Sequence, residues 1–154
     1  MNFKNMFLFI ALYIIVMIIR SQVKARKHKS IMGYIVMEGN TVHIYEKEFV
    51  RYNEIERIAE LGLDQSDMKN GLAVVDVPQN KKSFELADDV LYSFRDFDIE
   101  SKEMKVHTTR EKDRFIKHLG DTNKTPLNEQ KIPYLIEMKN LKVMSIEEKP
   151  EYSI

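Results

Sequence analysis

The sequence predicts an α+β protein in which an N-terminal transmembrane helix precedes a β-rich domain that is closed by an amphipathic helix. Three observations lead to this fold class. Residues 6–19 form an uncharged apolar run, residues 33–107 alternate between short apolar segments and turn residues, and residues 109–119 carry an apolar stripe at helical spacing. A series of strands followed by one such helix is typical of a design in which the helix covers an open end or face of a curved sheet.

The same patterns divide the 154 residues into five segments. The length leaves room for one domain of common size, an anchor and a tail. We expect a short flank over 1–5, a transmembrane helix over 6–20, a basic juxtamembrane linker over 21–32, a soluble β-rich domain with its terminal helix over 33–120, and a linker with a C-terminal segment over 121–154.

The apolar run MFLFIALYIIVMII suggests an uncleaved signal anchor. It is shorter than the roughly 20 residues of a usual span. Lys4 and Arg20 flank it, and their stems can extend the usable length by placing the charges in the headgroup region. The residues that follow carry basic side chains instead of a small-residue cleavage pattern. A removed signal peptide and a buried helix remain as alternatives.

The charges around this run predict an orientation and a surface. Residues 1–30 hold six Lys or Arg and no acid, which leaves 18 basic against 24 acidic residues in 31–154. Basic flanks stay cytoplasmic, so we expect a single-pass protein of the cell membrane with its C-terminal domain in the cytoplasm. The acidic balance argues against a nucleic-acid partner. Cations that would face an anionic membrane surface are Lys24, Arg26, Lys27, Lys29, Lys81 and Lys82.

Alternating apolar residues and turn signals predict the strands of the soluble domain. GYIVM and TVHIY flank Glu38-Gly39-Asn40 as a hairpin, and FVRY follows the charged turn 46–48. EIERIAEL is too short to assign to helix or strand. LAVVDV and SFEL flank residues 78–82 as a second hairpin with a basic tip at Lys81 and Lys82. VLYSF and MKVH are two further strands.

Residues 108–120 give the clearest helix signal in the soluble domain. Thr108-Thr109-Arg110-Glu111 fits a capping box, and Gly120 stands where a C-terminal capping glycine belongs. Phe115 and Leu119 are expected to be buried against the sheet. The segment after Pro133, IPYLIEMKNLKVM, reads either as a helix or as two strands that break at Lys139-Asn140.

The order of these segments resembles the bacterial pleckstrin-homology-like domain family over about residues 33–119. The matching positions are Tyr52, Ile55 and Ile58 in one segment, and Phe115, Ile116 and Leu119 in the helix. These positions mark packing and not chemistry. The resemblance implies a non-enzymatic scaffold for protein partners or lipid headgroups, and it transfers no functional residue.

No residue pattern indicates catalysis, a cofactor or a metal site. The chain has no Cys, and its four His residues lack the spacing of a zinc site. With five Gly residues there is no phosphate-binding loop and no GxSxG nucleophile motif. The acidic clusters Asp88-Asp89, Asp96-x-Asp98 and Asp64-x-x-Asp67 lack the spaced ligands and central glycine of a calcium loop, and we expect them to be solvated turns.

The function expected from the sequence is that of a membrane-anchored, non-enzymatic interaction or scaffold protein with a protein partner. Two alternatives stay open. One is a membrane-surface sensor of anionic lipid headgroups, and the other is an enzyme without a recognisable motif. The sequence leaves the identity of the partner and the oligomeric state undecided.

Overall fold

The computed structural model describes residues 10, 13–15, 17, 28–122 and 130–153. Six strands lie within these ranges: β1 (Lys29–Glu38), β2 (Thr41–Arg51), β3 (Leu72–Asp98), β4 (Glu103–Thr109), β5 (Tyr134–Lys139) and β6 (Lys142–Glu148). The helices are α2 (Ile55–Leu61) and α3 (Lys112–Thr122), with short 3-10 turns η1 (Gln65–Asp67), η2 (Lys69–Gly71) and η4 (Pro150–Tyr152).

The predicted transmembrane helix is not supported. Within the described ranges, no helix has the length and apolar character that a membrane crossing requires. The single-pass anchor over residues 6–20 and the cell-membrane localisation drawn from it are therefore wrong. The physical reason is length, since the apolar run has only fourteen residues and a usual span requires roughly 20. Most of this segment lies outside the described residues.

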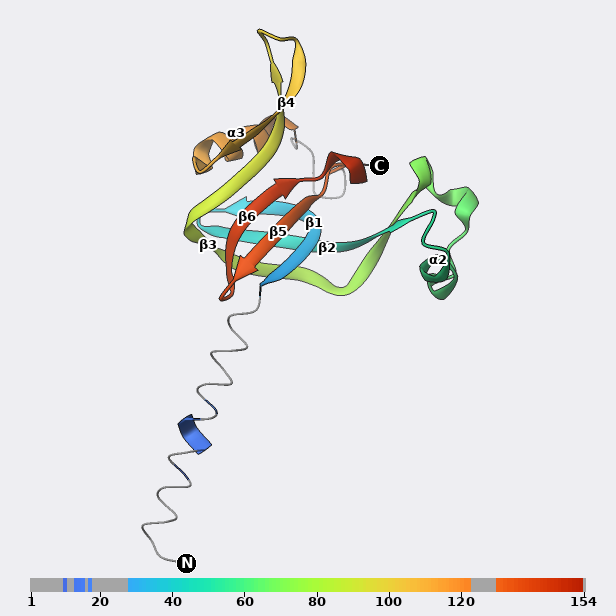
Figure 1. Ribbon diagram of the computed structural model, residues 1–154, viewed down its shortest axis with the longest axis horizontal. Coiled ribbons are helices and arrows are strands. Elements are labelled where there is room, and N and C mark those ends of the chain that lie inside the picture. Colours follow the sequence, from blue (N-terminus) through green and yellow to red (C-terminus); the bar gives the residue numbers. More distant parts are fainter. Residues whose placement is uncertain (1–9, 11–12, 16, 18–27, 123–129, 154) are drawn as a thin grey trace, which may run out of the picture.

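The strands form one sheet that closes on itself. Its order is β2-β1-β5-β6-β3-β4, and β2 also pairs with β3, so five strands make a ring and β4 extends from it. Figure 1 shows this curved sheet with α3 across its upper end. All neighbouring pairs are antiparallel except β3 and β6, which are parallel.

The predicted α+β class, with a helix that ends the domain, is also wrong. Helices α2 and α3 have seven and eleven residues, whereas strands make up most of the described chain. After α3 the chain returns to the sheet, where β5 and β6 lie between β1 and β3. The strand alternative for the C-terminal segment is thus the observed one. Asn140 and Leu141 make the turn between its strands, both with positive φ.

Two predicted turns are instead parts of long strands. Residues 46–48 continue β2, and residues 78–82 continue β3. Both halves of β3 pair with β2 in the same direction, with Val74 opposite Phe49 and Ser83 opposite His43, so no hairpin exists there. A register shift falls between these two stretches, where Pro78 offers no N–H and Gln79 has a φ of 52°. This irregularity bends the strand without reversing it.

The core fills the ring and continues under α3. Phe115 is fully buried, as predicted, and its ring stacks on Tyr92 at 4.6 Å between centroids. It also meets Phe94 at 5.8 Å and Tyr134 at 6.0 Å. Leu119 is half-buried and packs against the same cluster. One aromatic side chain of α3 therefore contacts two strands of the ring and closes its end.

A smaller cluster lies away from this core. The segment that the sequence left undecided is α2, which ends at Gly62 with a φ of 62°. Its buried Ile58 packs with Val50 of β2 and Met68. Arg57 of α2 donates to both carboxylate oxygens of Glu48, at 2.6 and 2.9 Å. These contacts fasten α2 and the turns after it to the ends of β2 and β3, as Figure 1 shows.

Two glycines give opposite predictions for the same substitution. A Cβ at Gly33 would collide with the backbone carbonyl of Tyr45 on β2. We expect Gly33→Ala to lower the free energy of unfolding by about 1 to 3 kcal/mol or more.

Gly120 was predicted to cap α3 but lies inside it with open space around its Cα. Gly120→Ala should raise stability by about 0.5 to 1 kcal/mol. Denaturant melts of both variants check these signs, and a stable Gly33→Ala protein would contradict the close approach of β1 and β2.

Candidate functional site

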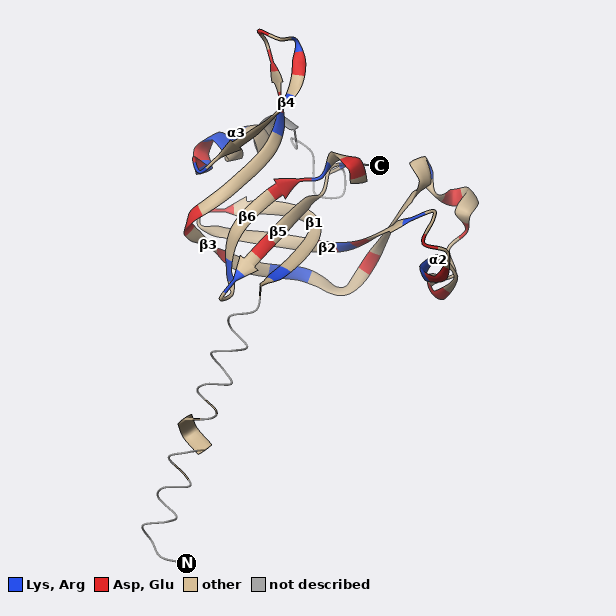
Figure 2. Ribbon diagram, in the orientation of Figure 1, with Lys and Arg blue, Asp and Glu red and all other residues tan. Residues whose placement is uncertain are grey.

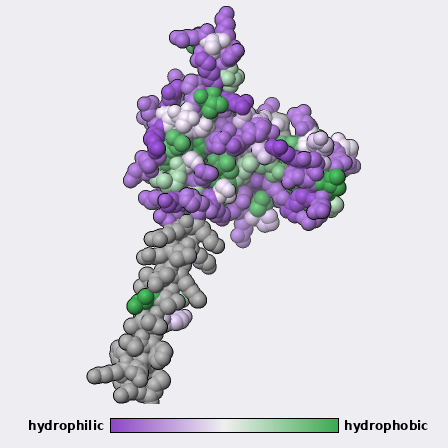
Figure 3. Space-filling view, viewed as in Figure 1, coloured by the Kyte–Doolittle hydropathy of each residue, from purple (hydrophilic) through white to green (hydrophobic). Residues whose placement is uncertain are grey.

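The most distinctive surface is a hairpin that extends beyond the ring, here called the arm and comprising residues 94–109. Pairing of β3 with β6 ends at Ser93, and from there β3 pairs only with β4. Figure 1 shows the arm projecting from the end of the sheet near α3. Figure 3 shows that it stands clear of the rest of the molecule. Beyond its base, where Phe94 is buried in the core, the arm thus presents both faces of a two-stranded ribbon to solvent.

One face of the arm is apolar. Phe97 lies opposite Met104, and Val106 lies opposite Arg95, so these four side chains share a face. Phe97 is 56% exposed, Met104 59% and Val106 62%. Ile99, in the turn that follows β3, is 83% exposed. Large apolar side chains gathered in this way on an exposed surface commonly mark an interaction site.

The other face of the arm is charged. It carries Asp96, Asp98, Glu103 and Lys105, and Figure 2 shows acidic and basic residues along the arm. Lys105 Nζ donates to Asp98 Oδ2 at 2.7 Å, and the Ser101 N–H donates to Asp98 Oδ1 at 2.9 Å. These hydrogen bonds hold the pKa of Asp98 below its ordinary value, with the Lys105 contact as the larger cause. They tie both strands to the turn and keep the ribbon in shape.

A buried polar pair fixes the base of the arm. His118 Nε2 of α3 lies 3.1 Å from Glu148 Oε1 of β6, and their side chains are only 3% and 2% exposed. Glu148 Oε2 accepts a hydrogen bond from the Arg95 N–H at 2.7 Å. The His118 ring also stacks on Phe94, with centroids 4.3 Å apart. The pair therefore links α3, β6 and the first residues of the arm.

The cations predicted to face a membrane surface do not form one cluster in the described chain. Lys24, Arg26 and Lys27 lie outside the described residues, and Lys29 is exposed at the start of β1. Lys82 forms an ion pair with Glu46. Lys81 lies over the Tyr45 ring, 5.7 Å from its centroid. The last two cations are thus strand residues engaged with β2, and the basic hairpin tip predicted for them is absent.

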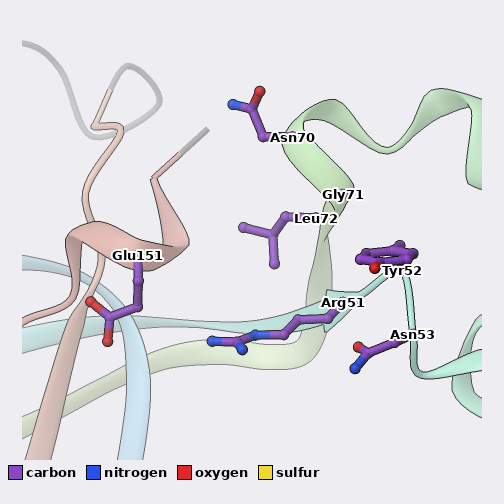
Figure 4. A pocket seen from close by; sticks show the side chains of 7 residues that line it. All are labelled: Arg51, Tyr52, Asn53, Asn70, Gly71, Leu72 and Glu151. Carbon is purple, nitrogen blue, oxygen red and sulfur yellow. The ribbon is translucent and has the colours of Figure 1, made fainter.

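A second surface feature is a cleft of about 330 Å³ where β2 ends and β3 begins. Figure 4 shows its lining, which consists of Arg51, Tyr52, Asn53, Asn70, Gly71, Leu72 and Glu151. Both charged groups already have partners in the chain. The guanidinium carbon of Arg51 lies 4.8 Å from the centre of the Tyr152 ring, and Glu151 lies 3.9 Å from Lys149. Glu151 thus faces a cation, whereas Arg51 is held against a neutral ring.

Within the described residues, no three His, Asp or Glu side chains come close enough together to hold a metal ion. The buried His118 and Glu148 are closed to solvent and so cannot meet a substrate in this arrangement. Of the features described, the arm gathers the largest set of exposed apolar side chains, which are Phe97, Ile99, Met104 and Val106.

Sequence reasoning missed the arm, although a signal for it was present. Strands were predicted at 90–94 and 104–107, and the intervening residues were interpreted as acidic turns. Phe97 and Ile99 alternate with Asp96 and Asp98, which is the period-2 pattern of a strand with two different faces. Extending the first predicted strand by this alternation would have located the apolar face.

Comparisons of the chain with protein-family models, curated proteins and solved structures find no match. The resemblance to the pleckstrin-homology-like family consequently stays a prediction that these comparisons do not test. Any function has to be argued from the geometry of the arm.

Proposed function

We propose that this chain is a non-enzymatic interaction module that binds a protein partner through the apolar face of the arm. The observation that carries the proposal is the separation of the two faces. Phe97, Met104 and Val106 share one face with Arg95, and Ile99 lies in the adjoining turn. Asp96, Asp98, Glu103 and Lys105 lie on the other face. Burying one such apolar side chain contributes roughly 1.5 to 3 kcal/mol, so several together can support specific binding.

The shape of the arm favours a protein over a small molecule. Small ligands bind in concave pockets that surround most of their surface. The arm is a projecting ribbon, and its apolar residues form a strip along one face. A strip of this kind is complementary to an extended segment or a groove of another protein. The outer edge of β4 has no neighbouring strand among the described residues, so its backbone groups can bond a further strand.

The fixed base of the arm also favours protein binding. Arg95, the first residue of the apolar face, is held through its backbone N–H by buried Glu148. Because Glu148 also contacts α3, the arm is fixed to the closed sheet at the point where it leaves it. A partner therefore meets a preorganised surface and loses little binding energy to ordering it.

The test is to compare partner recovery by variants of the two faces. We expect Phe97→Ser combined with Val106→Ser to reduce the amount of partner captured from cells by about tenfold or more, because each change removes apolar contact area. The matched control is Asp96→Ser, which alters the charged face of the same ribbon. Equal capture by this control and by the double variant, at unchanged thermal stability, would contradict the proposal.

A further inference from the structure

We propose that the edge of the arm binds a second copy of this chain, with two β4 strands antiparallel and Met104 on the twofold axis. This inference rests on the proposed function and specifies one partner of the arm. The paired arms would form a four-stranded sheet whose apolar side carries Phe97, Met104 and Val106 of both copies. The apolar faces of the two arms would thus form one continuous surface on the same side of the sheet, twice the size of the face on a single arm.

The order of strands in the sheet leaves β4 with an open edge for this contact. In the closed ring every strand has two neighbours, whereas β4 pairs only with β3. Its outer N–H and C=O groups over Glu103–Thr109 lack a neighbouring strand in the described chain. A free edge of this kind is a template for another strand, and a twofold contact uses the same edge on both copies.

The charges on β4 favour one alignment of the two β4 strands over the others. Only registers that oppose residues of the same face keep the apolar side continuous. With Met104 opposite Met104 of the second copy, Glu103 lies opposite Lys105 twice, once on each side of the axis. Shifting the axis to residue 103 or to residue 105 opposes two Glu or two Lys, which is unfavourable. Centring on Val106 places Lys105 opposite His107 and forms no Glu–Lys pair.

The outer edge of β3 in the arm is a poor alternative for self-pairing. Beyond Ser93 this edge is also without a strand neighbour. Its charged face carries Asp96 and Asp98, with no cation between them. Antiparallel pairing of two such edges therefore places acid opposite acid, whereas the β4 edge carries both Glu103 and Lys105.

The experiment measures the mass of the purified full-length protein by light scattering across a concentration series. We expect a concentration-dependent dimer. Glu103→Lys and Lys105→Glu should each weaken dimerisation by about tenfold or more, because each converts two attractive cross-strand pairs into two repulsive ones. The double variant E103K/K105E restores opposite charges and should dimerise again. Association through any other part of the chain would not respond to these exchanges.

Other outcomes overturn the inference in distinguishable ways. A wild-type protein that stays monomeric at all concentrations excludes the second copy, but it leaves capture of a different protein by the apolar face intact. A dimer that is insensitive to residues 103 and 105 but lost in Phe97→Ser shows that the arms pack face to face. A mass that grows beyond two copies indicates β3 pairing with β4 of the next copy. Thermal melts of each variant confirm that the fold is retained.

Discussion

Replacing Phe115 by Ala is expected to lower the free energy of unfolding by about 3 to 5 kcal/mol. Phe115 is fully buried, and its ring contacts Tyr92, Phe94 and Tyr134 at the closed end of the sheet. The substitution leaves a cavity among aromatic rings that belong to different strands, and these strands cannot all move inward. Urea unfolding of the variant and the wild-type protein, followed by circular dichroism, measures the difference.

The neighbouring residue supplies the control. Ile116 occupies the next position of α3 and is 41% exposed. Ile116→Ala should cost less than about 1 kcal/mol, since it removes little buried surface. Similar losses for both variants would mean that α3 does not cover the end of the sheet in the way described.

Replacing Glu148 by Ala is the second change with a large expected effect, a loss of about 3 to 5 kcal/mol. The carboxylate is buried, and it contacts His118 at 3.1 Å and the Arg95 N–H at 2.7 Å. Its removal deprives the buried His118 ring and the Arg95 N–H of this partner, and it removes a polar contact between α3 and β6. The same variant should also loosen the arm, which faster amide hydrogen exchange at residues 94–98 would reveal.

Glu147→Ala is the matched control on the same strand. The Glu147 side chain is 46% exposed and pairs with Lys149. Exposed pairs contribute at most about 1 kcal/mol, so this variant should unfold almost like the wild-type protein. If Glu148→Ala unfolds at the same denaturant concentration as Glu147→Ala, the buried pair does not hold the base of the arm.

The sequence predicted local structure better than it predicted the way the elements join. The first hairpin was recognisable because Gly39 and Asn40 separate two apolar runs, and β1 does pair with β2 there. The burial of Phe115 followed from the helical stripe. In contrast, β5 and β6 were found between strands that lie far earlier in the chain, and no local pattern encodes such long-range pairing.

The wrong assignments have specific physical causes. Polar residues such as Lys81, Lys82, Glu46 and Lys47 resemble turn residues in the sequence, but they lie within β2 and β3. Lys82 pairs with Glu46 and Lys47 with Asp76, while Lys81 lies over the Tyr45 ring. Pro78 was taken to reverse the chain, yet it only bends a long strand. The anchor was inferred from the apolar run, its flanking cations and the missing cleavage pattern, although the run was shorter than a membrane span requires.

The most direct test of the arm as a docking surface is site-specific photo-crosslinking in cells that express the protein. A photoreactive amino acid would replace Ile99 at the tip of the arm or Leu141 in the turn between β5 and β6. Both side chains are apolar turn residues, 83% and 74% exposed. We expect a discrete crosslinked protein from position 99 and none from position 141. Crosslinks that are equal at both positions, or found only at position 141, would contradict the assignment of the arm as the interaction site.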